Sequence, residues 1–180
     1  MSLIKDRLRT PRLTLRQPHR EDAPAIAHYL NDFAVAGNLA RVPFPYRFED
    51  ALAWLRTRKP GLPPEEANFA IQWDGAYIGQ VGFHPGPDGP LIGYWLGQPF
   101  WGRGFMSEAA AAAIDWFFAH SAAPVLHSGV FHFNAASLAI QKKLGFVETG
   151  RSCLLCLARN AEVEHIDTQL SQSAWKARKP

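Results

Sequence analysis

Residues 94–108, Y-W-L-G-Q-P-F-W-G-R-G-F-M-S-E, have the composition of an anion-binding turn at the start of a helix. Gly102 and Gly104 allow the backbone to take positive φ, and they carry no Cβ that would hold a ligand away. The helix that follows would present its unpaired N–H groups and the positive end of its dipole at this point. Arg103 adds a cation, and Ser107 is a favourable N-cap residue. The stretch therefore predicts a phosphate site, although from the two glycines alone a purely structural turn would be the better interpretation.

A second stretch, from Asn134 to Phe146, predicts a helix that Asn134 caps and that ends at Gly145 as its C′ residue. Together with Ile92-Gly93-Tyr94-Trp95 and the W-G-R-G-F-M-S-E-A segment that starts at Trp101, it resembles the GNAT superfamily of acetyl-CoA-dependent N-acetyltransferases. More narrowly, the chain is similar to the branch that contains the ribosomal-protein N-terminal acetyltransferases (RimJ/RimL-like). The resemblance covers nearly the whole chain and is specific for the superfamily, but it does not name a substrate.

The resemblance implies acetyl-CoA as the co-substrate and a binding site made largely of main-chain groups. Where the sheet of the family splays, the main-chain groups of Trp95–Gly97 should be unpaired and able to bind the pantetheine arm. A backbone N–H around Leu96 should stabilise the oxyanion. Met106 stands where the family motif has Gly or Ala. The residues implied in coenzyme binding are Trp95, Leu96, Gly97, Trp101, Gly102, Arg103, Gly104, Phe105, Met106, Ser107, Asn134, Ser137 and Lys143.

Acetyl transfer to an amine requires a neutral amine, a stabilised oxyanion and a proton for the leaving thiolate. Many family members carry a proton-donating Tyr on the helix after the motif asparagine, and this chain has none there. Ser137 is the candidate donor, with backbone capping as its alternative role. Relatives often carry Glu as base where this chain has Leu91, so His84 and Glu148 become the candidates. His165 and a water chain remain open alternatives.

Composition limits the possible classes of protein. The chain has 180 residues, 47% hydrophobic and 19% charged, which predicts a single globular domain over residues 1–180. The net charge of +3 is too small to indicate a nucleic-acid partner, and no apolar run is long enough to cross a membrane. The first residues lack the apolar segment of a secretory signal, so we expect a cytoplasmic protein. Cys153 and Cys156 should be ordinary thiols on opposite faces of a strand, and we expect no metal.

The expected fold is α/β (α+β), with a mixed, mostly antiparallel sheet of about seven strands that is splayed in the middle and has helices on both faces. Asp74-Gly75 predicts a tight hairpin, and a β-α-β unit around the Glu108–His120 helix predicts one parallel pair. Phe44, Tyr46 and Phe48 lie in or beside a loop and either fill the core or line an acceptor pocket. The tail 172–180 is expected to be mobile. The strands are expected at 13–17, 68–73, 76–83, 91–96, 126–133, 147–157 and 163–170.

The sequence thus predicts an N-acetyltransferase that moves an acetyl group directly to an amine, without a covalent enzyme intermediate. The acceptor is a protein N-terminus or a small-molecule amine, and a homodimer is an open alternative to a monomer. A non-catalytic acyl-CoA-binding or regulatory domain is the competing hypothesis, because the usual Glu and Tyr are missing.

Overall fold

The structure of the chain, a computed structural model, describes residues 7–59 and 61–178. The first six residues, on which the expected cytoplasmic location depends, lie outside this range. The elements in chain order are β1 (Leu8–Arg9), β2 (Leu13–Arg16), η1 (Arg20–Asp22), α1 (Ala23–Leu30), α2 (Phe33–Ala36), α3 (Phe48–Thr57), η2 (Pro64–Glu66), β3 (Asn68–Trp73), β4 (Ala76–Gly86), β5 (Gly89–Leu96), η3 (Gln98–Phe100), α4 (Phe105–His120), β6 (Val125–Phe131), α5 (Ala135–Leu144), β7 (Val147–Cys156), η4 (Leu157–Arg159), β8 (Ala161–Ser171) and α6 (Gln172–Ala177).

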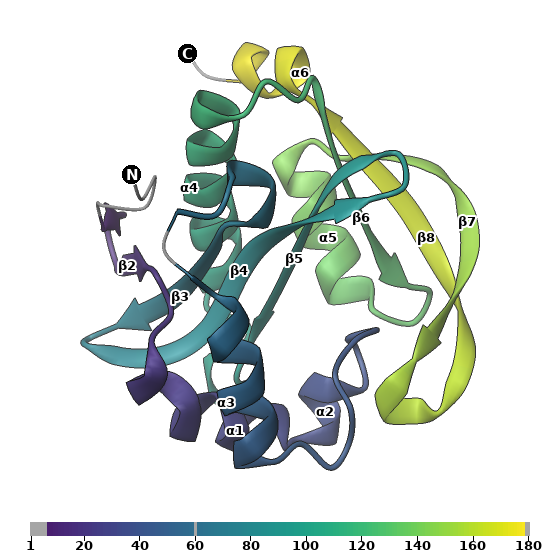
Figure 1. Cartoon of the computed structure of the whole chain (residues 1–180). Coiled ribbons are helices and arrows are strands. Elements are labelled where there is room, and N and C mark those ends of the chain that lie inside the picture. Colours follow the sequence, from purple (N-terminus) through teal and green to yellow (C-terminus); the bar gives the residue numbers. More distant parts are fainter. Residues whose placement is uncertain (1–6, 60, 179–180) are drawn as a thin grey trace.

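Over the described ranges, one eight-stranded sheet runs in the order β1-β2-β3-β4-β5-β6-β8-β7 (Figure 1). Every neighbouring pair is antiparallel except β5 and β6, which are parallel and joined through α4. The predicted mixed, mostly antiparallel sheet is therefore confirmed. Its eighth strand, β1, was missed because two residues are too few to show a periodic pattern.

The β3–β4 hairpin forms at the predicted place. Asp74 and Gly75 both have positive φ, 49° and 77°, as a two-residue turn of type I′ requires. The next turn is shorter than expected, because β4 extends to Gly86 and β5 begins at Gly89. Strand β5 therefore pairs with β4 along its whole length.

Helices cover both faces of the sheet, α4 and α5 on one face and α1 and α3 on the other (Figure 1). The Ala109–Ala113 segment makes α4 thin on one side, so the helix approaches the sheet closely and the Phe83 and Phe117 rings stack at 4.5 Å. Alternation along β5 then directs Tyr94 and Leu96 toward the α4 face and Trp95 toward the α1–α3 face. The two sides of the site are set by this alternation.

The C-terminal segment corrects one expectation. Gln172–Ala177 forms α6 rather than a mobile tail, and its Trp175 is buried with Nε1 donating to Asp115 Oδ1 at 2.7 Å. Only the last two residues of the expected tail lie outside the described range. No helix within the described ranges is both long enough and apolar enough to cross a membrane.

Candidate functional site

The sheet splits between β5 and β6. The only register at which these two parallel strands pair, within the described ranges, is Leu91 with His127. On the other side of β5, Gly97 N donates to Ile78 O at 2.9 Å. Because main-chain groups alternate in direction along an antiparallel strand, the N–H groups of Tyr94 and Leu96 face the split.

This register corrects the expectation that the main chain of Trp95–Gly97 is unpaired. Gly97 N is bonded to β4, and Leu96 O accepts a hydrogen bond from the Trp101 indole Nε1 at 2.9 Å. A Cβ on Gly97 would collide with the Tyr29 ring, so this glycine serves the packing of α1. The N–H groups that can meet a ligand are those of Leu96 and Tyr94, one and three residues before Gly97.

The predicted turn lies directly after this strand. Gly102 has φ 71° and Gly104 has φ 75°, so both glycines hold the positive φ that the sequence predicted. Helix α4 begins at Phe105, with Gly104 as its N-cap residue in the left-handed region. Ser107 is therefore inside the first turn and is not the N-cap, which corrects that prediction. The first N–H groups of α4 have no partner within the helix and point out of its N-terminus.

An ion pair fixes the start of α4 against the β1–β2 connection. Glu108 accepts hydrogen bonds from Thr10 Oγ1 at 2.5 Å, from Arg12 N at 2.9 Å and from Arg12 Nε at 2.7 Å. Burial alone would raise the pKa of Glu108, but these hydrogen bonds and the Arg12 charge hold it below its usual value. Arg12 Nη1 also donates to the carbonyl of Arg103 at 2.8 Å, which fixes the turn itself.

The start of α5 lies on the other side of the split. Asn134 Oδ1 accepts from Ser137 N at 3.1 Å, which makes Asn134 the N-cap residue as predicted. The Ser137 hydroxyl is left for another contact, and its Oγ lies 3.0 Å from the Tyr94 hydroxyl. The sequence reasoning did not assign Tyr94 to the site. Strand alternation places Tyr94 and Leu96 on one face, but only the packing of α5 shows which hydroxyl Tyr94 meets.

One cleft of about 1680 Å³ connects these parts. It exceeds the roughly 300–1,000 Å³ of an ordinary small-ligand pocket, so it has room for a long ligand and an acceptor together. The predicted site residues that line it are His84, Trp95, Leu96, Trp101, Gly102, Gly104, Phe105, Met106, Ser107, Asn134 and Ser137. Tyr46 also lines it, whereas Phe44 and Phe48 are exposed and do not.

Four predicted residues do not line the cleft: Gly97, Arg103, Lys143 and Glu148. Arg103 lies with its guanidinium 4.3 Å from the centre of the Trp73 ring. Lys143 is nine residues beyond Asn134 on α5, about 14 Å along the helix axis. Glu148 is paired with Lys142 Nζ at 3.1 Å on the surface. The geometry does not support these residues as parts of the site.

His84 lies on β4 directly opposite Leu91, half-buried in the cleft wall on the α1–α3 face. Burial, and then the charges of Arg41 and Arg58, lower its pKa to about 4. The imidazole is therefore neutral near pH 7 and can accept a hydrogen bond or a proton, although only as a weak base. His165, the other histidine considered as a base, holds Asp167 Oδ1 at 2.8 Å from Nδ1.

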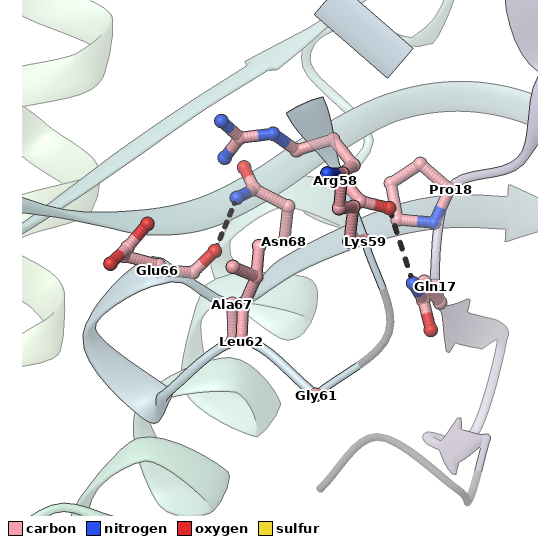
Figure 2. Close-up of a pocket in the computed structure, with 9 residues that line it drawn as sticks. All are labelled: Gln17, Pro18, Arg58, Lys59, Gly61, Leu62, Glu66, Ala67 and Asn68. Carbon is pink, nitrogen blue, oxygen red and sulfur yellow. Dashed lines mark hydrogen bonds between the residues drawn. The ribbon is translucent and has the colours of Figure 1, made fainter. Parts of the chain in front are cut away.

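A second, much smaller hollow near the end of α3 is too small to hold a substrate. It measures about 10 Å³ and lies between Gln17, Arg58 and Asn68, where Gln17 Nε2 donates to Arg58 O at 3.3 Å (Figure 2). Such a volume holds about one water molecule. Cys153 is exposed and Cys156 buried, both as free thiols, and neither lines the large cleft.

The glycine turn, the split and the capped α5 helix together match a known family. A profile described as an acetyltransferase (GNAT) domain matches residues 12–147. The chain belongs to the GNAT family of acetyltransferases. A relative, the SPbeta prophage-derived uncharacterized N-acetyltransferase YokL of Bacillus subtilis (strain 168), is 27% identical over 158 residues, covering 86% of each chain.

Solved structures agree on the GNAT fold. A GNAT-family acetyltransferase from Bacillus anthracis has 20% identity and a TM-score of 0.78, covering 93% of this chain and 99% of that one. RimJ from Mycobacterium smegmatis, solved in complex with CoA-disulfide, has 20% identity and a TM-score of 0.75, covering 93% and 87%. At these identities, the likeness shows the fold.

Proposed function

We propose that this GNAT protein transfers an acetyl group from acetyl-CoA directly to an amine. The observation that carries the proposal is that one cleft joins the Gly102–Gly104 turn at the start of α4 to the split beside Tyr94 and Ser137. A phosphate-binding turn and a pair of hydroxyl groups on one ligand path suit a long phosphorylated thioester.

The chain offers suitable partners for each part of coenzyme A. The first N–H groups of α4 and the glycine turn would hold the pyrophosphate, since a helix N-terminus attracts anions. The N–H groups of Tyr94 and Leu96 would pair with the amides of the pantetheine arm or with the developing oxyanion. RimJ, whose fold this chain shares, was solved with a CoA derivative. The coenzyme supplies an activated acetyl thioester.

The side chains around the split would move the protons. His84 faces the α1–α3 side, where the amine would enter, and its neutral imidazole would accept the proton that the attacking nitrogen loses. Ser137, on the opposite side, would give its proton to the leaving sulfur. Because neither cysteine lines the cleft, direct attack by the amine is favoured over an acetylated cysteine.

A non-catalytic acyl-CoA-binding domain is the second candidate. Two observations favour it: Leu91 replaces the carboxylate, and the low pKa of His84 makes the imidazole a weak base. The acceptor in the catalytic case would be a protein N-terminus or a small-molecule amine. The cleft wall around Trp54 and Tyr46 carries both an acid, Asp50, and a base, Arg58, and does not favour one acceptor over the other.

Thiol release from acetyl-CoA tests the two functions against each other. The panel would contain peptides with free N-termini, amino acids, a polyamine and an aminoglycoside. Amine-dependent release supports the transferase. Tight binding of acetyl-CoA by calorimetry, with no release for any amine, supports the binding domain. An absence of both binding and release contradicts both functions.

A further inference from the structure

The Tyr94 hydroxyl lies beside the Ser137 hydroxyl at the start of α5, although Tyr94 comes from a strand rather than a helix. Its Oη lies 3.0 Å from Ser137 Oγ, and both residues line the large cleft. Burial raises the pKa of the Tyr94 phenol, and hydrogen bonds with Ser137 and Gln141 offset this in part. The phenol therefore keeps its proton at neutral pH and can donate it.

A buried polar cluster holds α5 in the position that makes this contact. Gln141, four residues after Ser137 and on the same side of α5, is only 1% exposed. Its Nε2 donates to Ser128 Oγ at 2.9 Å, and Ser128 Oγ in turn donates to Ile92 O at 3.1 Å. Thr168 Oγ1 donates to Gln141 Oε1 at 2.6 Å.

These bonds join α5 to β5, β6 and β8 beside the split between β5 and β6. A buried and fully satisfied polar cluster gives a single arrangement of the elements that it joins. Side-chain nitrogen and oxygen atoms that are buried within the described ranges all have a hydrogen-bond partner. The cluster of Ile92, Ser128, Gln141 and Thr168 is therefore part of the cleft wall, and it sets the distance between Tyr94 and Ser137.

We propose that Tyr94 and Ser137 act as one proton-donating pair in which Tyr94 is the source of the proton and Ser137 delivers it. This inference rests on the proposed acetyl transfer. It assigns to β5 the phenol that many GNAT members carry on the helix after the motif asparagine.

The proton balance closes without a further reagent. As the C–S bond breaks and its electron pair goes to sulfur, Ser137 gives its proton to the sulfur and takes the phenolic proton of Tyr94. The tyrosinate regains a proton from the amine nitrogen, which has formed the new C–N bond, through His84 or water. One N–H proton is lost and one S–H proton is gained.

The test compares Tyr94→Phe, Ser137→Ala and the double variant, with Tyr77→Phe as the matched control. Tyr77 is also buried, donates to Gln80 Oε1 at 3.3 Å on β4, and does not line the cleft. Each single change at the pair should lower kcat by ~10²-fold, with coenzyme A affinity within about twofold of the wild type. The double variant should fall by ~10²-fold as well, because residues that act as a unit are not additive. Tyr77→Phe should keep the wild-type kcat.

Two kinetic results would overturn the pair: wild-type kcat in Tyr94→Phe, or losses that multiply to ~10⁴-fold in the double variant. A loss of coenzyme affinity equal to the loss of kcat in Tyr94→Phe would assign Tyr94 to binding only, which also overturns it.

A spectroscopic measurement is independent of turnover. The chain has four tyrosines, so ring-labelled [¹³C]tyrosine gives few resonances, and the Tyr94→Phe spectrum identifies that of Tyr94. We expect this resonance to shift on addition of coenzyme A and in Ser137→Ala. An unshifted resonance in both cases overturns the pair even if acetyl transfer is confirmed. If acetyl transfer fails while the resonance responds, the proposed function is wrong but the hydroxyl contact is real.

Discussion

Replacing Gly104 by valine separates the ligand-binding role of the turn from its contribution to folding. Gly104 has φ 75°, and a Cβ built on it would have only Arg12 Nη2 nearby, at 3.4 Å. The substitution therefore meets open space in the ligand-free protein, and its cost to folding is the left-handed backbone, about 1–2 kcal/mol. A total stability of roughly 5–15 kcal/mol tolerates that loss.

The Gly104→Val substitution should also weaken the binding of coenzyme A, which the backbone strain at residue 104 does not explain. A valine side chain at the N-cap of α4 stands where an anion must approach the N–H groups of the helix. We expect the Kd for coenzyme A, measured by calorimetry, to rise at least ~10-fold, about 1.4 kcal/mol.

Gly75→Val is the matched control. Gly75 has φ 77°, has nothing within 4 Å of a built Cβ, and lies in the β3–β4 turn away from the cleft. Both variants should lose a similar few degrees of Tm, at roughly 2–4 °C per kcal/mol. Only Gly104→Val should weaken binding. Wild-type affinity in a folded Gly104→Val protein, or equal weakening in both variants, would refute the reasoning.

Three further predictions concern two residues that position the site, Glu108 and Asn134, and the proposed base, His84. Glu108→Gln should lower the free energy of unfolding by roughly 1–2 kcal/mol at pH 7, the low end for hydrogen bonds to a charged group, because the Arg12 partner is half-exposed. Because the pKa of Glu108 is lower in the folded state, the stability difference between wild type and Glu108→Gln should persist at every pH above the unfolded-state pKa, near ~4.3. It should vanish as the pH falls through the folded-state pKa. Urea titrations that show a constant difference down to pH 3 would contradict this prediction. Asn134→Ala should lower the free energy of unfolding by about 1 kcal/mol, and Asn134→Ser should keep most of the wild-type stability. Equal denaturation midpoints for all three proteins would show that the Asn134 cap does not stabilise the protein. His84→Gln should lower kcat/KM by ~10²-fold at every pH from 5.5 to 8. The pH profile of the wild-type kcat/KM should show no inflection near 6.5, since the pKa of His84 is about 4. If the wild-type and His84→Gln profiles coincide, His84 is not the base.

Local backbone chemistry could be predicted from the sequence where a residue type has few alternatives. Positive φ at Gly102 and Gly104, the Asp74-Gly75 hairpin and the Asn134 cap all follow from such preferences, and the structure confirms them. Ser107 failed as an N-cap because a glycine three residues earlier could start the helix in the left-handed region. Phe105, the first residue of this helix, is buried in the core.

Contacts between distant elements could not be predicted in the same way. Tyr94 meets Ser137 because Gln141 holds α5 against β6 and β8, a relation between residues up to 43 positions apart. Glu148 was a reasonable base by type, but a neighbouring lysine pairs with it on the surface. The lowered pKa of His84 depends on Arg41 and Arg58, which reach the cleft from a loop and from the end of α3.

Intact-mass spectrometry of enzyme and acceptor in one reaction tests the central claim most directly. The protein would be mixed first with acetyl-CoA alone and then with the amine that gives the fastest thiol release. The account predicts that the protein mass stays constant in both steps, while the amine gains the mass of one acetyl group for each thiol released. An amine that stays unmodified while acetyl-CoA is bound, or a protein that gains an acetyl group before the amine is added and loses it afterwards, would contradict direct acetyl transfer.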